Sequence, residues 1–185
     1  MNMALTESTM LPLGSKAQPF SLPDPSGKTY ELSQFKDSKA LLIIFMCNHC
    51  PYVKHIADSL ASLARDYQDA PFSLVAINSN DFSNYPDDSP AKMAEEVANR
   101  GYTFPYLVDE SQEVAKAYRA VCTPDLFLYD ADQTLAYRGQ YDSSRPGKGA
   151  ATGEDIRRAI DALLAGNSVD EKQTPAIGCN IKWRA

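Results

Sequence analysis

The sequence lacks the features that mark several large classes of protein. No stretch approaches the ~18 consecutive apolar residues that a transmembrane helix requires. The first residues hold no basic segment followed by an apolar one, so no secretory signal is predicted and we expect a cytoplasmic protein. The net charge of -6 gives no surplus of basic residues for a nucleic-acid backbone. Neither nucleic acid nor membrane is therefore predicted as a partner. Because the sequence has no phosphate loop or dinucleotide fingerprint, no cofactor is expected.

Cysteine is also scarce, with four residues in the chain: Cys47, Cys50, Cys122 and Cys179. Structural disulfides are uncommon in the cytoplasm, so four cysteines in this setting indicate redox chemistry or metal binding. The search for a site therefore begins at the cysteines.

The apolar pattern predicts an α/β protein. Residues 40–46 form an uninterrupted apolar run, typical of a strand that is covered on both faces. A helical period follows from Pro51, and residues 72–77 predict a second strand, which completes a βαβ unit. Further segments predict a hairpin within 19–35, helices at 90–100, 111–119 and 152–165, a strand at 106–108, and a hairpin formed by 126–129 and 134–138. We expect one domain over residues 1–185, a three-layer sandwich with a mixed central sheet, an N-terminal hairpin extension, a leader at 1–16 and a C-terminal tail at 167–185.

Cys47 and Cys50 lie where the first buried strand meets the first helix. The unpaired N–H groups and the dipole at a helix N-terminus stabilise a thiolate, and the two-residue spacing allows a disulfide to close. We expect Cys47 to attack as the thiolate and Cys50 to resolve the mixed disulfide. Between them, Asn48 and His49 complete the motif, and a protonated His49 would favour the thiolate. Pro51 suits the first helical turn, where a missing N–H is harmless.

The order of a Cys-x-x-Cys motif at a strand–helix junction and a later Thr123-Pro124 resembles the thioredoxin superfamily. Within it, the chain resembles the redoxin branch, and in particular a peroxiredoxin-like group. The segments that carry this resemblance are residues 47–51, 121–130 and 178–183. The resemblance implies a thioredoxin-like fold in which Pro124 is cis, lies beside the dithiol, and follows a Thr123 whose backbone bonds a bound chain. It also implies a thiol–disulfide oxidoreductase with a thioredoxin-like or small-thiol electron donor and a protein or small disulfide as substrate.

Three departures from the resembled families stand out. Ile43 and Cys47 occupy the positions of the Pro and Thr that frame a peroxiredoxin's reactive cysteine, so an antioxidant peroxidase is the weaker alternative. Leu41 occupies the position of the buried Asp of thioredoxins, so we expect proton transfer through Glu110 or His49 instead. Asn48-His49 also replaces the Gly-Pro of thioredoxin.

Two further interpretations stay open. A copper or zinc protein would use Cys47, Cys50, His49 or His55, and Cys122 as ligands, although the catalytic interpretation assigns no metal. Cys122 and Cys179 are either inert buried thiols or a second pair, redox-active or structural, and the pair is a hypothesis that the sequence leaves open.

Overall fold

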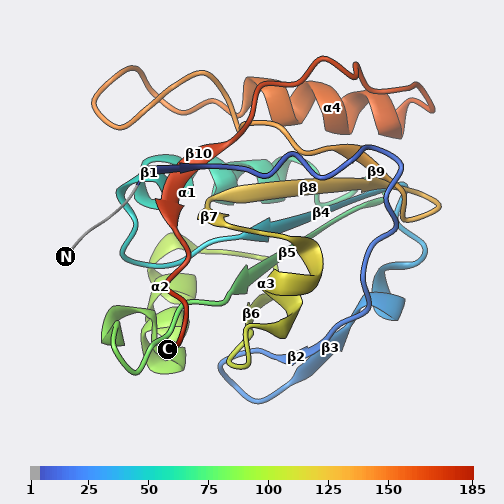
Figure 1. Cartoon of the computed structure of the whole chain (residues 1–185). Coiled ribbons are helices and arrows are strands. Elements are labelled where there is room, and N and C mark those ends of the chain that lie inside the picture. Colours follow the sequence, from blue (N-terminus) through green and yellow to red (C-terminus); the bar gives the residue numbers. More distant parts are fainter. Residues whose placement is uncertain (1–4) are drawn as a thin grey trace.

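The computed structural model describes residues 5–185 (Figure 1). Three sheets are formed, with strand orders β6-β5-β4-β8-β9, β1-β10-β7 and β2-β3. The strands are β1 (Leu5–Glu7), β2 (Ser21–Pro23), β3 (Thr29–Glu31), β4 (Ala40–Phe45), β5 (Phe72–Asn78), β6 (Tyr106–Val108), β7 (Cys122–Thr123), β8 (Asp125–Asp130), β9 (Leu135–Tyr137) and β10 (Ile177–Asn180). The helices are α1 (Pro51–Asp66), α2 (Pro90–Arg100), α3 (Glu113–Tyr118) and α4 (Glu154–Leu164), with short 3-10 helices η1 (Leu32–Phe35) and η2 (Pro86–Asp88).

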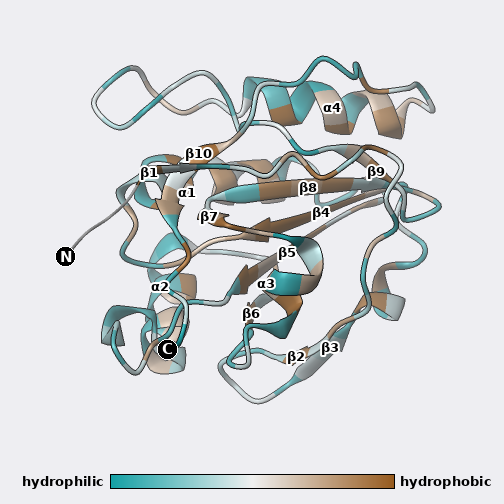
Figure 2. Ribbon diagram, viewed as in Figure 1, coloured by the Kyte–Doolittle hydropathy of each residue, from teal (hydrophilic) through white to brown (hydrophobic). Residues whose placement is uncertain are grey.

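The five-stranded sheet confirms the predicted fold class. β4 pairs in parallel with β5, and β5 with β6, whereas β8 and β9 continue the sheet in antiparallel pairing. The side chains of β4 alternate between two cores. Leu42 and Ile44 pack with α1, α2 and α4, while Ile43 and Phe45 pack with α3 and the β2–β3 hairpin. All six residues of β4 are buried between these two cores, which explains why the apolar run lacks alternation, and Figure 2 shows β4 largely in brown.

The first and last segments contain strands that the sequence pattern does not predict. β1 lies within the segment expected to be a leader, and the first four residues of that segment are outside the described part of the chain. β10 lies in the expected tail, between β1 and β7 (Figure 1). The sheet formed by β1, β10 and β7 therefore joins both segments to β7, the strand that precedes the cis bond beside the Cys-x-x-Cys motif.

No helix within residues 5–185 is long and apolar enough to cross a membrane.

Candidate active site

Cys47 and Cys50 lie in the turn that leads from β4 into α1. Cys50 is the N-cap of α1 and Pro51 is its first residue, as the sequence predicts. Cys47 lies three residues before Cys50, between the end of β4 at Phe45 and the start of α1. Both residues are buried, with exposed fractions of 2% for Cys47 and 0% for Cys50. The helix therefore points its N-terminal N–H groups at Cys50 and not at Cys47.

The electrostatics of the two thiols follow from this difference in position. Hydrogen bonds from the Cys179 and Cys47 thiols, with a further one from the Val53 N–H, lower the pKa of Cys50. Burial, the Cys50 thiol and the charge of Asp88 raise the pKa of Cys47. These directions favour the negative charge on Cys50 over Cys47, so Cys50 joins Cys47 as a candidate for the attacking thiolate, and the expectation for Cys47 stays a prediction. The hydrogen bonds of the Cys179 and Cys47 thiols contribute most to this preference, and the first turn of α1 adds the Val53 N–H.

Thr123 and Pro124 lie beside both thiols, and the peptide bond between them is cis, as the resemblance implies. The Thr123 hydroxyl is 3.5 Å from Cys47 Sγ, and the Thr123 carbonyl oxygen is 3.2 Å from Cys50 Sγ. β7 and the following cis bond therefore bring a backbone and a side-chain oxygen to the dithiol. Thr123 thus contacts both sulfurs of the motif.

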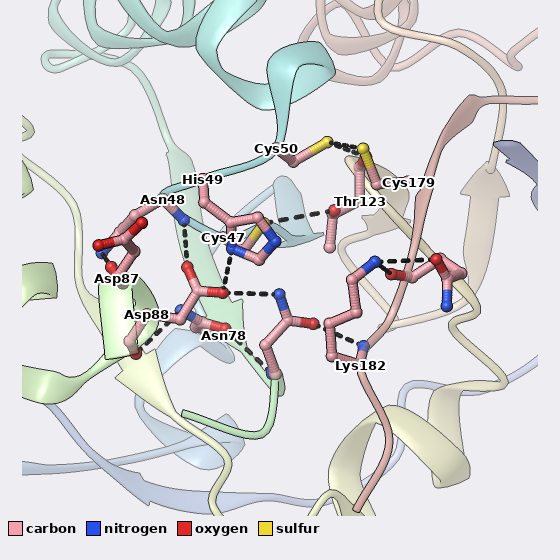
Figure 3. A network of polar contacts seen from close by, with 12 residues as sticks. Cys47, Asn48, His49, Cys50, Asn78, Asp87, Asp88, Thr123, Cys179 and Lys182 are labelled. Carbon is pink, nitrogen blue, oxygen red and sulfur yellow. Dashed lines mark hydrogen bonds and ion pairs between the residues drawn. The ribbon is translucent and has the colours of Figure 1, made fainter. Parts of the chain in front are cut away.

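Cys179 also belongs to this site. Its Sγ atom is 2.6 Å from Cys50 Sγ, and Figure 3 shows the two sulfurs facing each other. Cys122 is buried nearby, and its Sγ atom is 3.7 Å from the Pro124 carbonyl oxygen. Because Cys179 is opposite Thr123 in the β10–β7 ladder, the side chains of Cys122 and Cys179 project from opposite faces. The structure thus gives Cys179 a different neighbour from the one that the Cys122–Cys179 hypothesis names.

A buried carboxylate, Asp88, holds the two residues between the cysteines. The Asn48 N–H donates to Asp88 Oδ1 at 2.7 Å, and His49 Nδ1 is 2.6 Å from Asp88 Oδ2 (Figure 3). The His49 ring stacks on Tyr85, with 5.6 Å between ring centroids. The side chain of Asp88 is fully buried, whereas that of His49 remains 15% exposed. His49 is thus fixed next to Cys47, where it faces solvent on one side.

The network extends from Asp88 to the segment after β10. Asn80 Nδ2 donates to Asp88 Oδ2 at 2.8 Å, and Asn80 Oδ1 accepts from the Lys182 N–H at 2.8 Å. The Lys182 ammonium donates to the carbonyl and the side-chain oxygens of Asn180, each at 2.8 Å. Hydrogen bonds of Asn80 therefore connect the segment after β10 to Asp88, the carboxylate that binds Asn48 and His49 of the Cys-x-x-Cys motif.

Sequence reasoning did not assign roles to Asp88, Asn80 or Lys182. One signal was available, because the loop at 78–89 follows β5, a parallel neighbour of β4. Loops after adjacent parallel strands meet at the same edge of a sheet, and this edge is where ligand sites form. The two proton-transfer candidates lie apart: His49 is in the site, whereas Glu110 is 64% exposed and pairs with Arg184.

The structure places three potential metal ligands together. The ligand atoms of Cys47, His49 and Asp88 lie within 4.8 Å of one another. His55, which the metal interpretation also named, instead bonds the Ser144 hydroxyl through Nε2 at 2.7 Å. In tetrahedral zinc sites with bonds of ~2.0–2.2 Å, two ligand atoms lie about 3.4 Å apart. The separation of 2.6 Å between His49 and Asp88 is that of a hydrogen bond, so the geometry favours a proton-linked pair over two ligands of one ion.

Comparisons with known proteins relate the sequence and the fold of this chain to others. The family model described as AhpC/TSA family matches residues 13–138. Two crystal structures superpose with a TM-score of 0.96 each: a hypothetical protein from Sinorhizobium meliloti, 50% identical over 97% of this chain and 99% of that one, and an uncharacterised conserved protein from Geobacillus kaustophilus, 52% identical over 100% and 98%. The thiol-disulfide oxidoreductase ResA of Geobacillus kaustophilus is 27% identical over 85% of this chain and 82% of its own length.

Proposed function

The chain belongs to the AhpC/TSA family of redoxins, and from this premise we propose that it is a thiol–disulfide oxidoreductase whose working dithiol is Cys47 and Cys50. The observation that carries the proposal is the position of Cys50 as the N-cap of α1, with Cys47 one turn before it and the cis Thr123-Pro124 bond beside both. This arrangement supplies an anionic sulfur, a second sulfur within reach and oxygens that orient them.

The chemistry proceeds by two exchanges. The Cys50 thiolate attacks one sulfur of a substrate disulfide, a mixed disulfide forms, and the electron pair leaves on the other substrate sulfur. The Cys47 sulfur then attacks Cys50 Sγ, the bond from Cys50 to substrate breaks, and the proton of Cys47 passes to the departing thiolate. The first departing thiolate takes a proton from solvent, so the substrate disulfide is reduced to two thiols and the Cys47–Cys50 disulfide forms. A thioredoxin-like protein or a small thiol supplies the two electrons that restore the dithiol.

His49 and Asp88 support this reaction from the side of Cys47. The buried charge of Asp88 raises the pKa of Cys47 and so favours retention of its proton until the mixed disulfide has formed. His49 is hydrogen-bonded to that carboxylate and partly exposed, so it connects the buried pair to solvent. We assign His49 a positioning and proton-relay role, and not direct attack on substrate.

The test is a thiol titration in glutathione buffers, followed by counting of alkylated cysteines. The wild-type chain and Cys179→Ser are expected to show a two-electron transition, because both retain Cys47 and Cys50. Cys50→Ser is expected to lose it, while Cys122→Ser serves as the matched control with an unchanged midpoint. A Cys179→Ser protein that folds but shows no transition would contradict the proposal.

Peroxide reduction is the second candidate, because a thiolate at the N-cap of a helix also suits attack on a peroxide oxygen. Measuring hydrogen peroxide consumption with dithiothreitol as reductant separates the two candidates. We expect the wild-type rate to equal that of Cys50→Ser, since Ile43 and Cys47 replace the residues that frame a peroxide pocket in the resembled family. A rate that depends on Cys50 and saturates with peroxide would favour the peroxidase.

A further inference from the structure

β10 pairs with the edge of β7, the strand next to the dithiol. Cys179 is opposite Thr123 and Asn180 is opposite Cys122 in antiparallel register, and the Ile181 N–H donates to the Val121 carbonyl at 3.0 Å. An extended peptide binds a sheet edge in this same way, by adding a strand. The backbone of Thr123, which the resemblance assigns to a bound chain, is therefore paired with the protein's own segment. On its other side β10 pairs with β1, so it is the central strand of its sheet.

The strand that fills this edge carries a thiol directly to the dithiol. Cys179 Sγ is 2.6 Å from Cys50 Sγ, and Cys179 itself is only 4% exposed. Thr123 contacts Cys50 through its carbonyl oxygen and faces Cys179 across the ladder, so the same residue aligns both sulfurs. β10 thus presents Cys179 as a bound substrate would present its own cysteine.

Gly178 permits this close approach. A Cβ atom added at residue 178 would overlap the carbonyl oxygen of Thr123 and crowd Pro124 N. Both obstacles are backbone atoms next to the cis peptide bond, so no side-chain rotation relieves the overlap. Only glycine lets β10 lie close enough to β7 for Cys179 to reach Cys50.

We propose that Cys179 is a third redox thiol, which converts the Cys47–Cys50 disulfide into a Cys50–Cys179 disulfide by internal exchange. This step rests on the proposed function, because that function forms the Cys47–Cys50 disulfide. The Cys179 sulfur attacks Cys50 Sγ and the Cys50–Cys179 bond forms. The Cys47–Cys50 bond breaks and its electron pair leaves on Cys47 Sγ, which takes up the proton that Cys179 loses. No net oxidation occurs, so the step needs no additional oxidant.

The charges around Cys179 fit such a relay. In the reduced protein, the hydrogen bond with Cys50 and burial raise the pKa of Cys179, so Cys179 stays a thiol while Cys50 carries the charge. When Cys50 enters a disulfide, that negative charge disappears. The Lys182 ammonium, which favours a thiolate on Cys179, then acts without an opposing anion. Oxidation of Cys50 therefore prepares Cys179 for attack.

The test uses the full-length Cys47→Ser variant, which retains Cys50 and Cys179. The protein is treated with one equivalent of diamide, quenched with acid, alkylated in denaturant and mapped by mass spectrometry of non-reduced peptides. We expect a Cys50–Cys179 link, and the same link in Cys47→Ser/Cys122→Ser, the matched control. Adding Gly178→Ala should slow its formation about tenfold, because the displaced strand removes the alignment of the sulfurs. Two thiols that stay alkylatable, or a link from Cys50 to Cys122, would overturn the proposal.

The wild-type protein provides a second measurement, which also covers a Cys47→Ser protein that fails to fold. After one equivalent of disulfide substrate, the Cys47–Cys50 link should appear first and the Cys50–Cys179 link should grow at its expense. A persistent Cys47–Cys50 link with no Cys50–Cys179 link overturns the relay but leaves the proposed function intact, whatever Cys47→Ser shows. A wild-type chain that forms neither link refutes the proposed function itself.

Discussion

Replacing Asp125 with Asn should change the free energy of unfolding in a pH-dependent way, with the variant gaining relative to wild type as the pH rises from acid to neutral. Asp125 begins β8 directly after the cis bond and is fully buried. Its Oδ2 accepts from the Val121 N–H at 3.2 Å, and contacts with Ser8 and Cys122 also favour the ionised form, although burial outweighs them. Burial raises the pKa of Asp125 from 3.8 to about 6. The ionised carboxylate is therefore less stable in the folded protein than in the unfolded chain.

The size of the effect follows from this difference in pKa. A rise from 3.8 to about 6, at ~1.4 kcal/mol per pH unit, corresponds to about 3 kcal/mol at full ionisation. Because the folded pKa is the higher one, the unfolded chain loses its proton first, and stability is lost as the pH rises from about 4 through 6. About 1 kcal/mol is already lost at pH 4.5 and nearly all of it at pH 7.5, so the difference between Asp125→Asn and wild type should grow by about 2 kcal/mol across this window.

Guanidinium unfolding of both proteins with excess reductant, at pH 4.5 and 7.5, measures this difference. Other carboxylates titrate in the same range, but they are common to both proteins and cancel. With a slope of ~4 kcal/mol per molar for a chain of this size, the expected change is a relative shift of about 0.5 M in the unfolding midpoint. A difference that is constant between the two pH values, or one that shrinks as the pH rises, would refute the reasoning.

Three other predictions concern the site. Thiolate absorbance near 240 nm at pH 7 should persist in Cys47→Ser and disappear in Cys50→Ser, because the Cys179 thiol and the Val53 N–H still stabilise an anion at Cys50; its loss in Cys47→Ser would assign the thiolate to Cys47. Asp88→Asn should lower the free energy of unfolding by about 2–4 kcal/mol, since one end of the amide must then point an N–H at a donor of Asn48 or Asn80; denaturation at constant pH measures it, and a neutral result would contradict the network. Gly178→Ala should lower the same quantity by about 1–3 kcal/mol through overlap with the Thr123 carbonyl, and a variant as stable as wild type would show that β10 shifts freely.

The sequence predicts the five-stranded sheet well, because its elements are strongly patterned. The apolar run at 40–46 is β4 up to Phe45, and the helical period from Pro51 is α1. The Thr123-Pro124 motif marks the cis bond through its resemblance to a known family. These features depend on local sequence alone, and so does the placement of Cys47 and Cys50 before the helix.

The rest of the site depends on contacts between residues far apart in the chain. β10 has only four residues, and its pairing with β7 depends on the fit of Gly178 against Thr123, which no periodicity reveals. Asp88 resembles any acidic loop residue until β5 brings its loop beside β4. The sequence places the start of the helix at Pro51 correctly, but the pKa of Cys50 also depends on the hydrogen bond with Cys179, a residue far along the chain. The local pattern therefore could not show which of the two cysteines the surroundings favour as the anion.

The order of segments along the chain has a consequence during biosynthesis. All five strands of the large sheet, α1 and β7 precede β10, so a ribosome makes the Cys-x-x-Cys motif and the cis-proline segment well before residue 179. At ~5–20 residues per second, the stretch between β8 and β10 takes about 2–9 seconds to synthesise. During that interval the edge of β7 has no partner, and Cys50 meets external disulfides without Cys179 beside it. A nascent chain stalled before β10 should therefore form mixed disulfides with glutathione faster than the finished protein.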